Sequence, residues 1–313
     1  MEGNSRTDRH AVLIVTYNRA ALLRECVEAI LAQTRAYDDV LIVDNASTDG
    51  TSDYLNILER KERFHIVRER KNLGGAGGFS EGLRHVHTLH PDWITIIDDD
   101  AVLEPDFLEQ IERAIGKYGR SYRCFAGVPL TDGIRRGHRR RVQGRILKKE
   151  TAVPYEEYRR ESFSCEIGSF CGLVMADSLI PEIGYPDARY FIWYDDTEYC
   201  LRIAEHTRIL NWNKAVIQHK AVVDDSGSYV VGWKEYYGIR NRIHMAGKHY
   251  GLCTKEYIIL RKRVRGMLLL VRLLLKGKPR EAMQTGKLYH CAIRDGKRKQ
   301  LGLHPVYRPG YKP

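Results

Sequence analysis

The chain has 313 residues, 43% of them hydrophobic and 10% aromatic, a composition that excludes a mainly disordered protein. Its seven cysteines are scattered without a Cys-x-x-Cys pair, which argues against a disulfide framework or a cysteine zinc site and favours a reducing compartment. The first ten residues are polar, so we expect no secretory signal. The net charge of +11 is uneven: residues 255–313 hold 16 Lys and Arg against 3 acids, which indicates a polyanionic partner, either nucleic acid or an anionic membrane.

The first part of the chain alternates short apolar runs with helical patterns. Buried strands are predicted over residues 11–17, 40–43, 65–68 and 93–97, and a helical pattern follows each of the first three. This order favours an α/β fold, a mostly parallel sheet with helices on both faces. The carboxyl ends of the strands should meet at one edge, where open α/β sheets bind ligands. We expect that edge to gather Thr16, Asp44, Asn45, Asn72 and Asp98.

Three adjacent acids, Asp98, Asp99 and Asp100, close the strand that begins at Trp93. Neighbouring carboxylates repel one another unless a cation or hydrogen-bond donors offset the repulsion. A divalent cation that carries a diphosphate would do so. The alternative is a solvated acidic turn that caps a helix predicted over residues 105–118.

A glycine cluster, residues 74–78, opens the third helix. The chain has no Gly-x-Gly-x-x-Gly after its first strand and no P-loop, so neither a Rossmann dehydrogenase nor a P-loop ATPase is supported. The glycines would let the backbone approach a ligand closely, or let the helix pack on the sheet.

Further strands are predicted over residues 124–128, 169–176, 208–212 and 216–219. Between the first two, residues 134–150 carry eight Arg and Lys with a single acid. This run is either a solvated loop or hairpin, or a contact for an anionic acceptor or a phosphate.

A second acidic pair, Asp195 and Asp196, follows the aromatic residues 190–194. Bulky aromatic neighbours raise the pKa of a carboxyl group, which suits a general base or acid. Either acid could instead cap the helix that the pair opens. His219 ends the last predicted strand, where a lone histidine is more often structural than a metal ligand.

Together these motifs resemble those of family-2 glycosyltransferases with the GT-A fold, over about residues 10–250. The resemblance rests on residues 15–19 (Val-Thr-Tyr-Asn-Arg), 43–51 (Val-Asp-Asn-Ala-Ser-Thr-Asp-Gly-Thr), 72–79 (Asn-Leu-Gly-Gly-Ala-Gly-Gly-Phe), 98–100 and 193–196. It implies a nucleotide-sugar donor, a metal-binding Asp-x-Asp motif with Asp98 and Asp100 at its ends, and Asp196, or less favoured Asp195, as the catalytic base.

The sequence of residues 72–79 and the motif Trp193-x-Asp195-Asp196 are most similar to those of bacterial galactofuranosyltransferases. In these enzymes a histidine completes the metal site. That role would fall to His219. Tyr194 departs from their pattern, so the donor is either UDP-galactofuranose or, as the alternative, dTDP-rhamnose. The resemblance implies donor-binding roles for Thr16, Tyr17, Asn18, Arg19, Asp44, Asn45, Asn72, Gly75, Asp98, Asp99 and Trp193.

The chemistry agrees with these roles. Mn²⁺ or Mg²⁺ held by carboxylates would stabilise the charge that develops on the leaving diphosphate, and an imidazole ligand favours Mn²⁺ slightly. The base would take the proton of an acceptor hydroxyl as it attacks the anomeric carbon from the opposite face. Inversion follows without a covalent intermediate.

The C-terminal part is basic and has helical patterns over residues 232–250 and 255–276. Its charges exclude a membrane-spanning helix. An interfacial helix on anionic lipid fits, and so does a helix packed on the catalytic domain or at a dimer interface. The resemblance implies a polyprenyl-diphosphate-linked glycan as the acceptor.

We therefore expect a GT-A catalytic domain over residues 1–231 and a basic helical extension over residues 232–313 that serves acceptor or membrane association. The expected activity is metal-dependent, inverting hexosyl transfer in bacterial cell-wall, capsule or O-antigen synthesis. The expected location is the cytoplasm, peripheral on the inner face of the cell membrane. The sequence leaves both a monomer and a homo-oligomer as alternatives. A nucleic-acid-binding protein is the alternative of a different class, but no RRM, zinc-finger or helix-turn-helix pattern supports it.

Overall fold

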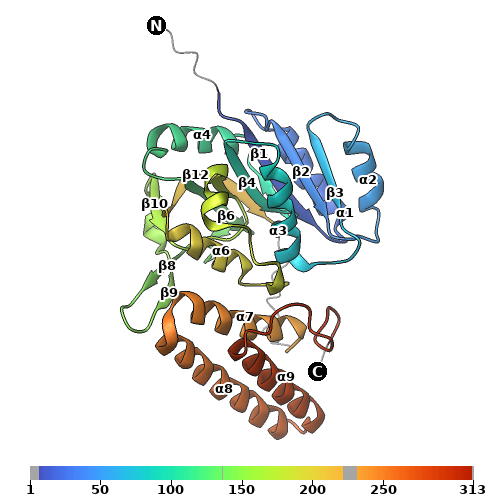
Figure 1. Cartoon of the computed structure of the whole chain (residues 1–313), viewed down its shortest axis with the longest axis vertical. Coiled ribbons are helices and arrows are strands. Elements are labelled where there is room, and N and C mark those ends of the chain that lie inside the picture. Colours follow the sequence, from blue (N-terminus) through green and yellow to red (C-terminus); the bar gives the residue numbers. More distant parts are fainter. Residues whose placement is uncertain (1–6, 136, 221–230, 312–313) are drawn as a thin grey trace.

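The computed structural model describes residues 7–135, 137–220 and 231–311. A mixed sheet lies at its centre, and three C-terminal helices form a group at one end (Figure 1). The strands follow the order β10-β12-β6-β11-β4-β1-β2-β3, with β5 beside β12 and β7 beside β6, while β8 and β9 pair separately. The strands are β1 (His10–Thr16), β2 (Asp39–Asp44), β3 (Phe64–Arg68), β4 (Trp93–Asp98), β5 (Ala101–Leu103), β6 (Cys124–Thr131), β7 (Ile134–Arg135), β8 (Arg140–Gln143), β9 (Lys149–Ala152), β10 (Ser162–Cys165), β11 (Leu173–Ala176) and β12 (Ile209–His219).

Helices cover both faces of the sheet, and together they form three layers. Side chains of α1, α2 and α4 share one hydrophobic cluster with one face, and side chains of α3, α5 and α6 share a second cluster with the other. Along β1, Val12 and Ile14 belong to the first cluster and Ala11 and Leu13 to the second, as expected for alternating strand residues. The helices are α1 (Ala20–Leu31), α2 (Thr51–Leu58), α3 (Gly74–His87), α4 (Phe107–Tyr118), α5 (Ile180–Ile183), α6 (Asp195–Ala204), α7 (Trp233–His249), α8 (Gly251–Leu275) and α9 (Pro279–Lys297), with short 3₁₀ helices at Tyr155–Arg159, Asp177–Leu179 and Ala188–Tyr190.

The expected α/β architecture is confirmed, since β1 is parallel to β2 and β4, and β2 is parallel to β3. The prediction of one strand over residues 169–176 is wrong. Gly172 has a φ of +74°, which breaks the extended backbone, and β11 therefore begins at Leu173. It runs antiparallel to both of its neighbours, β4 and β6. The two strands predicted over residues 208–219 are one strand, β12, with an irregularity between Asn211 and Val216.

The acidic triplet does not cap a helix. Strand β5 follows it directly, and α4 begins only at Phe107, with Asp106 as its N-cap. The structure therefore contradicts the interpretation of the triplet as a helix cap.

The C-terminal helices α7, α8 and α9 share a third hydrophobic cluster with residues of the sheet-bearing part, among them Ala76, Tyr190 and Phe191. The division at residue 231 stays a prediction, and residues 221–230 before it lie outside the described part of the chain. Among the described helices, none combines the length and the apolar character needed to cross a membrane.

Candidate active site

The carboxyl ends of β1, β2 and β4 border a cleft of about 610 Å³. His219, at the end of β12, lies on the same side as Asp100, and residues 191–197 with the start of α7 form the facing wall. Most of the residues singled out in the sequence meet in this cleft. They are Thr16, Tyr17, Arg19, Asn45, Asn72, Gly75, Asp98, Asp99, Asp100, Trp193, Asp195, Asp196 and His219.

Two expected donor-binding residues, Asn18 and Asp44, do not line the cleft. The side chain of Asn18 accepts the backbone N–H of Thr48 at 2.6 Å, and Asp44 accepts that of Ser47 at 2.9 Å. Both side chains thus shape the turns behind the cleft wall, and their contact with a donor stays a prediction.

Hydrogen bonds from Thr16 and Arg19 hold two residues of the acidic triplet in place. Asp99 accepts Thr16 Oγ1 at 2.8 Å and Arg19 Nη1 at 3.0 Å, and the same Arg19 nitrogen lies 2.8 Å from Asp100 Oδ2. Asp98 has no such donor in the described part of the chain. Burial and the neighbouring carboxylates of Asp100 and Asp99 raise the pKa of Asp98 to about 7.

His219 completes a possible cation site at this wall. It pairs with Ala101 across the β12–β5 ladder, which puts its Nε2 3.3 Å from Asp100 Oδ1. Ligand atoms of Asp98, Asp100 and His219 all lie within 4.8 Å of one another. In the described chain, Asp100 Oδ1 and His219 Nδ1 are buried and form no hydrogen bond. Two carboxylates with one imidazole suit Mn²⁺ or Mg²⁺, so the residues present fit the expected metal.

The aromatic loop, residues 190–194, forms the facing wall and has an unusual backbone. Phe191, Trp193 and Tyr194 have φ values of 65°, 65° and 68°, in the left-handed region. Residue 74 must be glycine here, because a β-carbon at that position would lie 2.0 Å from the carbonyl oxygen of Phe191. The packing role expected of the glycine cluster is confirmed at Gly78, where a β-carbon would lie 2.5 Å from Val15. Gly75 borders the cleft, and its close approach to a ligand stays a prediction.

Asp195 and Asp196 open α6 directly after this loop. Asp195 is 7% exposed, and burial followed by the charge of Asp196 raises its pKa well above the usual value. Asp196 is half-buried, and its Oδ1 accepts the backbone N–H of Thr197 at 2.6 Å and the hydroxyl of Thr197 at 3.1 Å. Burial raises the pKa of Asp196, while the charge of Arg140 opposes the rise.

Helix α7 holds the aromatic loop from outside. The buried amide of Asn241 donates to the carbonyl oxygens of Tyr190, Ile192 and Trp193 at 2.9–3.0 Å. Arg240, 1% exposed, donates to the carbonyl oxygens of Arg189 and Tyr190. These side-chain donors satisfy backbone carbonyl oxygens of the loop, where no strand pairing is available to do so among the described residues.

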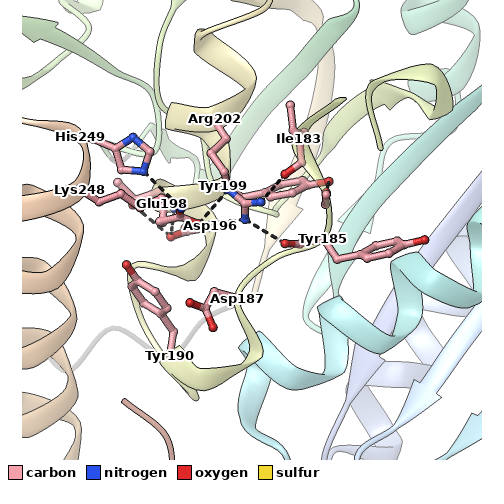
Figure 2. Close-up of polar contacts among 12 residues, drawn as sticks. Ile183, Tyr185, Asp187, Tyr190, Asp196, Glu198, Tyr199, Arg202, Lys248 and His249 are labelled. Carbon is pink, nitrogen blue, oxygen red and sulfur yellow. Dashed lines mark hydrogen bonds and ion pairs between the residues drawn. The ribbon is translucent and has the colours of Figure 1, made fainter. Parts of the chain in front are cut away.

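A second link joins α7 to α6, the helix that carries the two acids. Figure 2 shows the carboxylate of Glu198, 1% exposed, between Arg202 of α6 and Lys248 and His249 of α7. The distances are 2.9 Å to Arg202 Nη2, 2.6 Å to Lys248 Nζ and 3.0 Å to His249 Nε2. Burial alone would raise the pKa of Glu198, but the His249 hydrogen bond and the charges of Arg202 and Lys248 hold it at about 2.

Among the cleft residues that the sequence did not assign to the site are Arg140, Ser169, Phe170, Trp233, Lys234 and Pro309. Arg140 comes from β8 and donates to Thr197 Oγ1 at 2.8 Å, beside Asp196. Its signal was the basic run of residues 134–150, and part of that run does face the cleft. Residue 136 of the same run lies outside the described residues. Nothing in the pattern around Pro309 pointed to the cleft.

Comparison with known proteins identifies the family of the chain. A family model described as Glycosyl transferase family 2 matches residues 11–173. Galactofuranosyltransferase GlfT1 of Mycobacterium tuberculosis is 26% identical over 193 residues, which cover 61% of this chain and 63% of the relative. Galactofuranosyltransferase GlfT2 of Mycolicibacterium smegmatis is 27% identical over 278 residues, covering 77% and 41%. The chain thus spans less than two thirds of the length of these relatives.

Solved structures show the same fold at low identity. The structure of S. aureus TarS 1-349 in complex with UDP-GlcNAc has a TM-score of 0.59 and 14% identity, covering 97% of this chain and 98% of that one. GalNAc-T7 with UDP, GalNAc and Mn²⁺ has a TM-score of 0.60 and 14% identity, covering 78% and 48%. The expected GT-A fold is confirmed. Since the family model covers more than half of the residues, this chain belongs to glycosyl transferase family 2.

Proposed function

We propose that the protein is an inverting glycosyltransferase that moves a sugar from a nucleotide-sugar to an acceptor hydroxyl. One observation carries the proposal: a single cleft holds the Asp98, Asp100 and His219 cluster on one wall and Asp195 and Asp196 on the other. In such a cleft, a bound nucleotide-sugar would have a cation site for its leaving diphosphate and a carboxylate for the proton of the acceptor hydroxyl.

The favoured donor is UDP-galactofuranose. The likeness to GlfT1 and GlfT2, two galactofuranosyltransferases, supports this choice. The alternative donor is dTDP-rhamnose, because Tyr194 departs from the galactofuranosyltransferase pattern. The nucleotide would lie along the ends of β1 and β2, near Thr16, Tyr17 and Asn45.

Asp98, Asp100 and His219 would hold Mn²⁺ or Mg²⁺. When bound, this cation supplies Lewis-acid stabilisation of the charge that develops on the diphosphate. Arg19 and Lys234 line the same cleft and would add positive charge at the leaving group.

Asp196 is favoured over Asp195 as the base. The Asp195 carboxyl group is nearly buried and rests on backbone N–H groups at the start of α6. Asp196 is more exposed and uses Oδ1 for Thr197, while its Oδ2 accepts no hydrogen bond from the described residues. Oδ2 would therefore take the proton of the acceptor hydroxyl, and burial makes the carboxylate a stronger base.

The proposed acceptor is a polyprenyl-diphosphate-linked glycan, used in the synthesis of a bacterial cell-surface polysaccharide. The protein would act in the cytoplasm, peripherally on the anionic inner face of the cell membrane. The basic C-terminal region supports this location through its 16 Lys and Arg against 3 acids.

The test is binding and turnover of UDP-galactofuranose, UDP-galactopyranose, UDP-glucose and dTDP-rhamnose, with and without Mn²⁺, using a lipid-linked acceptor extract. We expect manganese-dependent binding and turnover of UDP-galactofuranose, with Asp98→Asn losing binding and the exposed-surface control Asp53→Asn behaving as the wild type. If dTDP-rhamnose alone responds, the donor assignment is wrong and the mechanism stands. If no sugar nucleotide binds, the proposed activity is wrong.

A further inference from the structure

Helix α8 has two apolar faces. Its inner face packs on α7 and α9 through Thr254, Ile258, Ile259 and Gly266, which are buried. At 100° per residue, a second apolar row lies on the opposite side of the helix, where side chains are 43–84% exposed. The row consists of Tyr257, Leu260, Val264, Met267, Leu268, Val271, Leu274 and Leu275. An exposed apolar row of this length marks a contact surface.

Positive charges border this outer row. Residues 251–276 contain seven Lys and Arg and a single acid, Glu256. Arg261 and Arg272 follow one side of the row, and Arg263 lies on the other. A complementary partner must therefore be apolar in its interior and anionic at its surface.

The hairpin β8–β9 presents further exposed apolar side chains near the start of α8. Its tip exposes Ile146 by 73% and Leu147 by 46%. The N–H of Lys148 donates to Thr254 Oγ1 at 3.0 Å, and that hydroxyl donates to the carbonyl oxygen of Ile146 at 3.4 Å. The tip is thus fixed to the first turn of α8, beside which it lies in Figure 1.

A groove of about 660 Å³ between α8 and α9 adjoins the row and shares Met267 with it and Arg263 with its border. Leu270 and Ile293 also line the groove. Arg294, Lys297 and Arg298 add cations from α9. The same combination of apolar floor and positive rim therefore extends beyond α8.

We propose that the outer row of α8 and the tip of the β8–β9 hairpin form one surface that docks on an anionic lipid bilayer. A second copy of the chain fits less well, because pairing two α8 helices would bring seven cations and one acid of each copy together. A coiled-coil seam uses two apolar positions in every seven residues. The row is broader than that, because Leu268 and Leu275 each add a third apolar position in their heptad. This inference deepens the membrane association within the proposed function and names the residues that would make it.

The test is sedimentation of the full chain with vesicles of phosphatidylcholine mixed with phosphatidylglycerol, and with vesicles of phosphatidylcholine alone. The variant is L260E combined with L268E, two residues 58% and 62% exposed. Ile57→Glu on α2 is the matched control, because Ile57 is 57% exposed and lies outside this surface. Ile146→Glu tests the hairpin tip separately.

We expect the wild type to bind the anionic vesicles, to bind less at high salt and to bind pure phosphatidylcholine weakly. L260E with L268E should weaken partitioning about tenfold or more, Ile146→Glu by less, and Ile57→Glu not at all. Wild-type binding that these variants leave unchanged would overturn the proposal. So would a wild-type dimer that L260E with L268E splits without any effect on vesicle binding.

Sugar-nucleotide binding measured on the same samples tests the proposed activity separately from the proposed docking surface. The surface lies apart from the donor-binding cleft, so all four proteins should bind the donor equally. Vesicle binding without donor binding would reject the proposed activity and leave the docking surface standing. Donor binding without vesicle binding would reject the docking surface alone.

Discussion

The donor-side wall of the cleft, at the ends of β1, β2 and β4, and the facing wall, formed by residues 190–196, are held in place by different means. On the donor side, Thr16 and Asp98 are themselves the last residues of buried strands, so the sheet positions them directly. On the facing side, a loop in left-handed conformations depends on Asn241 and Arg240 of α7. Glu198 ties α6, the helix that follows the loop, to Lys248 and His249 of α7. The strands themselves position the side chains of the donor-side wall, whereas the backbone of the facing wall is positioned by residues of a helix that lies far away in the sequence.

The largest effect is expected from a substitution that removes the proposed base on the facing wall without changing the shape of that wall. Asp196→Asn should lower kcat about 10²- to 10⁴-fold, because the acceptor hydroxyl loses its base. Donor affinity, measured by calorimetry, should stay at the wild-type value. Asp195→Asn is the matched control, and a larger loss of kcat in that variant would transfer the role of base to Asp195.

The next effect concerns the ion pairs of Glu198, which join α6 to α7 and take no part in the proposed reaction. Glu198→Gln should lower the free energy of unfolding by about 3 kcal/mol at neutral pH, because Arg202, Lys248 and His249 lose their buried carboxylate. The folded-state pKa of about 2 lies below the ordinary 4.5, so this stabilisation is complete above pH 4.5 and is lost as the pH falls from 4.5 toward 2.

Urea unfolding across that pH range checks this expectation. The difference between wild type and Glu198→Gln should shrink as the pH falls. Glu205→Gln, which removes the 64% exposed partner of His249, is the control and should change stability little. A pH-independent difference would show that the charge of Glu198 is not what stabilises the helix pair.

A smaller effect tests the loop itself. Asn241→Ala leaves the carbonyl oxygens of Tyr190, Ile192 and Trp193 without their donor, which should cost about 1–3 kcal/mol of stability. Turnover should fall roughly tenfold, because Trp193 and the two acids lose their fixed position. Asn211→Ala, at another fully buried asparagine, is the control. Equal losses of turnover in both variants would mean that general destabilisation, rather than the loop, is responsible.

The smallest effect is expected on donor binding, to which Lys234 would contribute a positive charge. Lys234→Met should weaken donor binding about five- to tenfold at low salt, because a cation is lost beside the diphosphate. Burial and the charge of Arg19 lower the pKa of Lys234, as expected where cations gather around an anion site. Lys214→Met, an exposed lysine outside the cleft, is the control. Unchanged donor affinity at every salt concentration would remove Lys234 from the donor site.

The two walls also differ in how far the sequence predicted them. Strand periodicity placed Thr16, Asn45 and the acidic triplet at one edge, because the ends of parallel strands necessarily meet there. A strand was predicted where β11 lies, but not its start or its antiparallel direction, since a single positive φ at Gly172 leaves no periodic trace. Lys234 and Pro309 were not predicted for another reason: only the docking of α7 and of the segment after α9 brings them to the cleft, and no local pattern encodes that docking.

The three bonds from the Asn241 amide bear on any attempt to exchange parts between relatives. A chimaera that takes the helices from α7 onward from another family member inherits a different set of donors for the backbone of residues 190–193. The natural joint for such an exchange is therefore not the start of α7. The aromatic loop and α7 form one unit, and moving them together would keep the hydrogen bonds that hold the loop.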